Sequence, residues 1–146
     1  MISIRSRTWT IAGLLLGAAI TLGGCDYDDD CDDYYPPPPP TLPPTAFATD
    51  TEFTWTGTFA AYSATDEYLW VTVWDEVFIE FVGIDFLGQV RVQIFDSTNV
   101  QIFDETFLGN GDFQQVNLVS DLGLAGEWTV IVTTFDVFGQ VTVRFD

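Results

Sequence analysis

The chain has 146 residues, with 22 Asp and Glu against four Arg and with no Lys or His, so its formal net charge is −18. So acidic a chain repels nucleic acid and anionic lipid headgroups, which excludes both as electrostatic partners. Without His or Lys it lacks the usual general bases, and we expect no enzyme and no zinc site.

The first 24 residues combine a basic start with an apolar run. Arg5 and Arg7 precede the run Trp9–Leu22, and no acid occurs among residues 1–24. A transmembrane helix needs about 20 apolar residues, whereas a run of this length is typical of the core of a secretory signal peptide. We therefore predict a signal-peptide helix over residues 1–24.

The end of this segment resembles the lipobox of bacterial lipoproteins, because Leu22, Gly23 and Gly24 precede Cys25. The resemblance implies cleavage after Gly24 and a diacylglycerol thioether on Cys25. It also implies an extracytoplasmic protein held by its lipid on a bacterial membrane. The sequence leaves open whether that is the inner membrane, the outer membrane or the cell surface.

Residues 25–46 follow with six Asp between Asp26 and Asp33 and with all seven prolines. Like charges and prolines both extend a chain, so we predict a disordered tether. The alternating Asp residues resemble the start of an EF-hand loop, but Cys31 stands where that loop needs Gly, and Pro37 stands where it needs Glu. Cys31 is left as a free thiol or as a partner in an intermolecular disulfide.

Residues 47–146 alternate between apolar and polar side chains in short runs, which is typical of β-strands. We expect an all-β domain, a single antiparallel β-sandwich or jelly roll of about eight strands, with a core sufficient without disulfides. The expected strands cover residues 53–59, 68–74, 76–82, 89–95, 99–107, 113–119, 127–135 and 140–145.

Two of the turns share a sequence. "DFLGQVRV" (residues 85–92) matches "DVFGQVTV" (residues 136–143) at Asp, Gly, Gln and both Val. An Asp followed three residues later by Gly suits a type I turn closed by a left-handed Gly. We predict that each copy is a hairpin corner.

Residues 66–146 resemble the pre-peptidase C-terminal domain, a small jelly roll of secreted bacterial proteins. The similarity rests on "DEYLWVTV", "VQIFDSTNVQIF" and the closing "AGEWTVIVTTFDVFGQVTVRF". Trp128 departs from the Tyr that is usual there, and the turn after Asp96 lacks a Gly. The resemblance allows a calcium-stabilised accessory module.

Two sets of residues are candidate ligand sites. Alternation places Tyr68, Trp70 and Trp74 on one face of a strand, where they form a stacking platform for sugars or proteins if that face is exposed, and a part of the core if it is not. Four acids at expected strand ends are candidates for weak calcium binding: Asp66, Glu67, Asp112 and Asp136.

Together these features predict a membrane-anchored bacterial envelope lipoprotein with a non-catalytic β-sandwich that is a binding or structural module. Its expected partners are the membrane, through the lipid, and a glycan or an envelope protein. The alternatives are a carbohydrate-binding or adhesive domain that uses the aromatic face and a calcium-stabilised accessory domain. A protein adapted to high salt, whose acidity reports no ligand, is the third alternative.

Overall fold

The computed structural model describes residues 42–146, which form six antiparallel strands. The expected signal segment, Cys25, Cys31 and most of the expected tether lie outside the described residues. No helix within residues 42–146 is long and apolar enough to cross a membrane. The strands are β1 (Thr45–Ala48), β2 (Phe53–Thr72), β3 (Phe78–Phe95), β4 (Gln101–Asn110), β5 (Gln114–Val119) and β6 (Gly126–Phe145).

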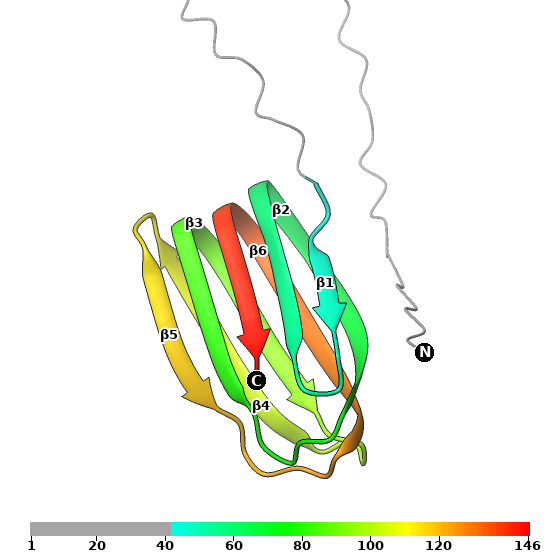
Figure 1. Cartoon of the computed structure of the whole chain (residues 1–146). Coiled ribbons are helices and arrows are strands. Elements are labelled where there is room, and N and C mark those ends of the chain that lie inside the picture. The colour runs from blue at the N-terminus through cyan, green and yellow to red at the C-terminus, as the bar shows by residue number, and fades with distance from the viewer. Residues whose placement is uncertain (1–41) are drawn as a thin grey trace, which may run out of the picture.

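The hydrogen-bonded sheet folds over on itself into two layers, because β2, β3 and β6 are long and bent (Figure 1). The first layer has the order β1, β2 (residues 53–59), β6 (137–145), β3 (78–84) and β5. The second layer has the order β2 (64–72), β6 (126–134), β3 (87–95) and β4. The all-β sandwich expected from the sequence is therefore confirmed, with six strands rather than eight.

The eight expected strands become six because three pairs of them merge into the continuous strands β2, β3 and β6, and because β1 adds a strand that was not expected. In β3 and β6 the two merged segments meet at an expected hairpin corner, which is a bend instead. At the bend of β3, Asp85 and Gly88 have positive φ angles of 52° and 91°; at the bend of β6, Asp136 and Gly139 have 49° and 89°. The left-handed glycines are thus confirmed, but the hairpins are wrong. Each strand crosses from one layer to the other, with a register shift at the bend.

The core lies between the two layers and is made by alternate residues of every long strand. Phe53, Trp55 and Phe59 share one face of β2 and point inward, and the intervening Thr residues point outward. Phe81 of the first layer stacks on Phe107 of the second, with ring centroids 4.0 Å apart. Residues 42–146 thus supply a complete hydrophobic core of their own.

The two ends of the sandwich differ. The bends of β2, β3 and β6 and the β4–β5 turn form one end, which we call the bend end; the described chain begins on this side (Figure 1). The opposite end, the loop end, carries the β1–β2, β2–β3, β3–β4 and β5–β6 connections and the C-terminus.

Candidate functional site

The aromatic face of residues 68–74 points into the core at Trp70, which is the second of the two alternatives that the sequence leaves open. Trp70 is only 1% exposed, and its ring packs edge-on against Trp128 with centroids 5.7 Å apart. Tyr68 is half-buried and meets Phe53. The aliphatic face, which includes Val71 and Val73, is the one exposed to solvent.

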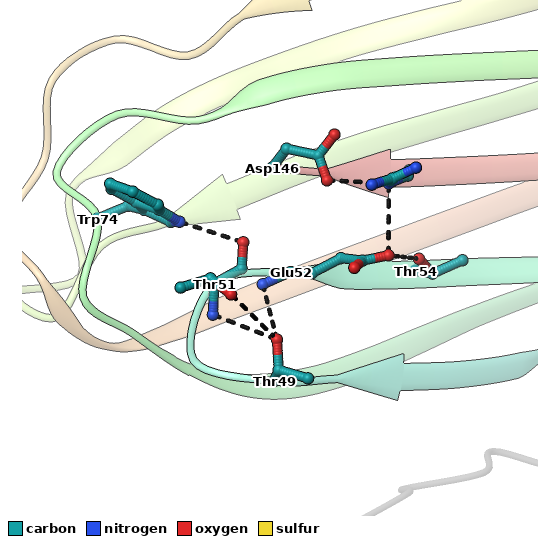
Figure 2. A network of polar contacts seen from close by, with 7 residues as sticks. Thr49, Thr51, Glu52, Thr54, Trp74 and Asp146 are labelled. Carbon is teal, nitrogen blue, oxygen red and sulfur yellow. Dashed lines mark hydrogen bonds and ion pairs between the residues drawn. The ribbon is translucent and has the colours of Figure 1, made fainter.

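The indoles of Trp70 and Trp74 hold the β1–β2 turn at the loop end, and Figure 2 shows the contact made by Trp74. Trp70 Nε1 donates to the carbonyl of Thr49 at 2.6 Å, and Trp74 Nε1 donates to that of Thr51 at 3.1 Å. Thr72 Oγ1 donates to the carbonyl of Asp50 between them. Trp74 is 41% exposed, but its donor is already used, so it acts first as a structural clamp.

The turn that the indoles hold is also fixed by its own side chains and by an ion pair. Thr49 Oγ1 accepts the amide of Glu52 at 3.0 Å, and Glu52 in turn lies 3.3 Å from Arg144 Nε (Figure 2). Arg144 also pairs with Asp146 at 2.9 Å. Every charged group of this network has a partner, so the network ties the turn to β6 rather than offering a ligand site.

The four candidate calcium ligands do not form a site. Asp66 and Glu67 lie within β2 rather than at a strand end, and successive residues of a strand point to opposite faces. Asp112 lies in the β4–β5 turn and Asp136 in the bend of β6. Within residues 42–146 no three His, Cys, Asp or Glu side chains come together as a metal site would require.

The structure instead gathers polar groups along the side of the sandwich where β2 runs. We call this group, which consists of Trp55, Tyr62, Asp66 and Tyr68, the edge cluster. Because β2 bends between residues 59 and 64, its two halves face each other, and their inward side chains meet at this edge. The rings of Trp55, Phe59 and Tyr62 stack in series, with centroids 5.5 and 5.0 Å apart.

Burial and mutual interaction perturb the acids of the edge cluster. Burial raises the pKa of Asp66 above its ordinary value, and the nearby Tyr62 hydroxyl opposes this only in part. Burial and then the Asp66 carboxylate raise the pKa of Tyr68 to about 12. Both tyrosines are therefore neutral at physiological pH, and each keeps a hydroxyl that can donate and accept.

Two buried polar atoms of the edge cluster have no hydrogen-bond partner. Trp55 Nε1 approaches the Tyr68 hydroxyl without reaching hydrogen-bond geometry, and Asp66 Oδ2 is likewise unpaired. One is a donor and the other an acceptor, and buried polar atoms in native proteins are normally paired with protein or water. A hydroxyl group, of water or of a ligand, has the chemistry to satisfy both.

A second polar group, on the outer face of the second layer, differs from the edge cluster because its charged atoms are paired. Arg91 forms a two-point ion pair with Asp104, at 2.7 Å from Nε and 2.6 Å from Nη2. The amides of Gln93 and Gln101 also donate to Asp104, at 3.4 and 3.3 Å. These donors lower the pKa of Asp104, with the bond from Arg91 the largest cause. This group satisfies itself and leaves no buried polar atom for a ligand.

Sequence reasoning found two members of the edge cluster and assigned them other roles: Tyr68 to an exposed platform and Asp66 to calcium. It missed Trp55 and Tyr62 as site residues. The available signal was that Trp55 lies on the inward face of its strand, although alternation does not show which residues face it across the sandwich. That pairing depends on the bend of β2.

The fold and this edge define a two-layer antiparallel β-sandwich that carries at one side a cluster of a buried Trp with half-buried Tyr and Asp side chains. No family model and no curated protein sequence matches the chain. Among solved structures it is similar to a CBM4 carbohydrate-binding module, with 13% identity over 70% of this chain and 71% of that one and a TM-score of 0.39.

Two further structures are similar over small parts of their own length. The enzymatically active domain of tailspike protein 4 of bacteriophage CBA120 aligns with 71% of this chain and 17% of its own, at 9% identity and a TM-score of 0.41. An arabinose-bound α-L-arabinofuranosidase aligns with 64% of this chain and 18% of its own, at 12% identity and a TM-score of 0.36. Similarities this distant identify no ligand.

Proposed function

We propose that the protein is a lipid-anchored envelope protein whose β-sandwich is a non-catalytic module that binds carbohydrate at the edge cluster. The observation that carries the ligand class is the pair of unpaired atoms, Trp55 Nε1 and Asp66 Oδ2, beside the hydroxyls of Tyr62 and Tyr68. Sugar hydroxyls donate and accept at once, and sugar rings stack on aromatic side chains.

Charge narrows the class of sugar. Residues 42–146 contain 16 Asp and Glu against Arg91 and Arg144, a net charge of −14. The edge cluster adds a carboxylate and no cation. Uronic acids and sulfated sugars would be repelled, so the proposed ligand is a neutral or amino sugar.

The chemistry of the edge cluster supports a non-catalytic role as part of the proposal. Glycoside hydrolysis needs two carboxyl groups about 5 to 9.5 Å apart across the bond that is cleaved. Asp66 is the one carboxyl group of the edge cluster. The cluster therefore supports recognition of sugar hydroxyls rather than cleavage of a glycosidic bond.

A glycan array with residues 42–146 tests the ligand, followed by calorimetry on the sugars that bind. We expect Asp66→Ala and Tyr62→Ala to weaken binding about tenfold or more, which corresponds to 1.4 kcal/mol. The matched control is Asp104→Asn, which alters the outer polar group on the other surface. Loss of binding in the control as well, or binding of acidic glycans alone, would contradict the proposal.

A water molecule at the edge cluster is the competing explanation of the unpaired atoms. In that case no neutral or amino sugar on the array would bind in a manner that depends on Asp66. An experimental structure would then show an ordered water between Trp55 Nε1 and Asp66 Oδ2, and the carbohydrate proposal would be abandoned.

The anchor is tested separately on the full chain in a bacterial host. We propose that Cys25 carries diacylglycerol, on the strength of the lipobox at Leu22, Gly23 and Gly24. Labelling with radioactive palmitate should mark the protein, and Cys25→Ser should abolish the label, whereas Cys31→Ser should not. Equal labelling of the Cys25→Ser variant would refute the anchor without affecting the ligand proposal.

A further inference from the structure

Large apolar side chains are exposed together at the bend end, in a group that the edge cluster does not include. We call them the bend-end patch. Phe135 and Phe113 are 66% and 65% exposed, which is unusual for side chains of this size. The other exposed members are Ile84, Leu87, Leu108 and Phe138.

Strand register shows that these side chains are neighbours. Leu87 pairs directly with Phe138 at the two bends. Gln89 pairs with Leu108 on one side and with Phe135 on the other. Leu108 and Phe135 therefore lie in one row across the sheet. When the register of β3 with β5 is extended by one pair beyond Gly83 and Gln114, Phe113 lies opposite Ile84. The patch therefore extends across the end of the sandwich from β5 to β6.

Acids lie among these apolar side chains, and no cation within residues 42–146 balances them. Asp85 and Asp136 occupy the bends themselves, and Asp112 lies in the β4–β5 turn beside Phe113. The two cations among residues 42–146 are committed elsewhere, because Arg91 pairs with Asp104 and Arg144 pairs at the loop end. Residues 42–146 therefore leave no cation to balance the three acids, which suit the cations of a partner.

We propose that the bend-end patch is the docking surface for a cationic amphipathic segment of a partner protein, with apolar side chains over the Phe and Leu residues and Lys or Arg over the acids. Apolar area supplies affinity and complementary charge supplies orientation and rate. A bilayer fits less well, because insertion of the patch would desolvate Asp85, Asp112 and Asp136 beside it.

The test uses residues 42–146, whose core is complete, and a designed 18-residue helical peptide of Leu and Lys as the probe. A peptide with the same Leu face and Glu in place of Lys is its counterpart. We expect the Lys peptide to bind and the Glu peptide not to bind. The Lys peptide should bind the Phe135→Ser/Phe138→Ser variant about tenfold more weakly than the unaltered chain. The matched control is Leu122→Ser/Leu124→Ser, which removes two exposed apolar side chains at the loop end.

A second variant keeps the test decisive if the Phe substitutions prevent folding, which a thermal melt would reveal. Asp85→Asn/Asp136→Asn keeps the side-chain shapes, and Asn tolerates positive φ. We expect it to weaken binding of the Lys peptide, and we expect 0.3 M salt to weaken binding to the unaltered chain. The proposal is overturned if the Glu peptide binds equally, if the loop-end control loses as much affinity, or if phosphatidylcholine vesicles bind through the same Phe residues.

Discussion

The backbone of Gly88 in the bend of β3 lies against the carbonyl group of Asp136 in the bend of β6. A Cβ atom at Gly88 would collide with that carbonyl oxygen. The relationship is reciprocal, because a Cβ at Gly139 would collide with the carbonyl oxygen of Asp85. The repeated sequence thus marks two bends that pack on each other, each with a Gly that admits the other's Asp.

Replacing either bend glycine with alanine should destabilise the fold by about 3 kcal/mol or more, from the collision and from a φ near 90° together. Gly111→Ala is the matched control, because Gly111 has a φ of 87° but its nearest atom to a new Cβ is Leu87 Cδ2 at 3.6 Å. We expect about 1 kcal/mol there. Urea unfolding measures all three, and equal losses would show that φ alone matters.

Truncation of Trp70 to Ala should destabilise the fold much more than truncation of Trp74 to Ala. Trp70→Ala removes a fully buried indole that contacts Phe53, Trp128 and Phe145, and should cost about 3–5 kcal/mol. Trp74→Ala removes an exposed ring with one hydrogen bond and should cost about 1 kcal/mol. Denaturant unfolding compares them, and a larger loss for Trp74→Ala would contradict the inward orientation of this face.

Asp96 should make stability depend on pH in the acid range. Its Oδ1 accepts the amides of Thr98 and Val100 and its Oδ2 accepts that of Leu124, which ties the β3–β4 turn to the β5–β6 loop. These bonds, that from Val100 foremost, lower the pKa of Asp96 to about 2. Its contribution is therefore complete above the unfolded pKa of about 3.9 and is lost as pH falls toward 2.

Asp96→Ala should lower the melting temperature at pH 7 by roughly 5–15 °C. Its deficit relative to the unaltered chain should shrink between pH 4 and pH 2, where the native carboxylate becomes protonated. Asp96→Asn retains one acceptor but presents an NH₂ group to the Leu124 amide. Its melting temperature should therefore lie between those of Asp96→Ala and the unaltered chain. Calorimetry over that pH range is the measurement, and a constant deficit would disprove the linkage.

The effect of Asp66 on the pH dependence of stability should be opposite in sign to that of Asp96. Its pKa is raised by burial, so the folded state favours the protonated form, and the ionised carboxylate costs stability at neutral pH. Asp66→Asn should stabilise the fold at pH 7 by roughly 0.5–1 kcal/mol, a modest gain because the group is partly solvated. The gain should disappear as pH falls below the raised pKa. A destabilised Asp66→Asn variant at pH 7 would show that the carboxylate is structural.

Much of the fold is legible in the sequence because alternation is a local property. Period two predicts that Phe53, Trp55 and Phe59 share one face, and turn chemistry predicts the left-handed glycines at 88 and 139. Short β1, with one exposed Phe, carries too little pattern to predict. The edge cluster is legible only in part, because Trp55 and Asp66 lie 11 residues apart on different layers.

What the sequence determined by itself is the class of the domain, an acidic β-sandwich with alternating strands; the resemblance of residues 22–25 to a lipobox stays a prediction of an anchor. Tertiary structure decided which face of residues 68–74 is buried, because both faces are apolar and only packing against Trp128 and Phe145 distinguishes them. It also decided that the repeated turns are bends. A turn becomes a hairpin or a bend according to the strand with which the next segment pairs, and that pairing is made by residues distant in the chain.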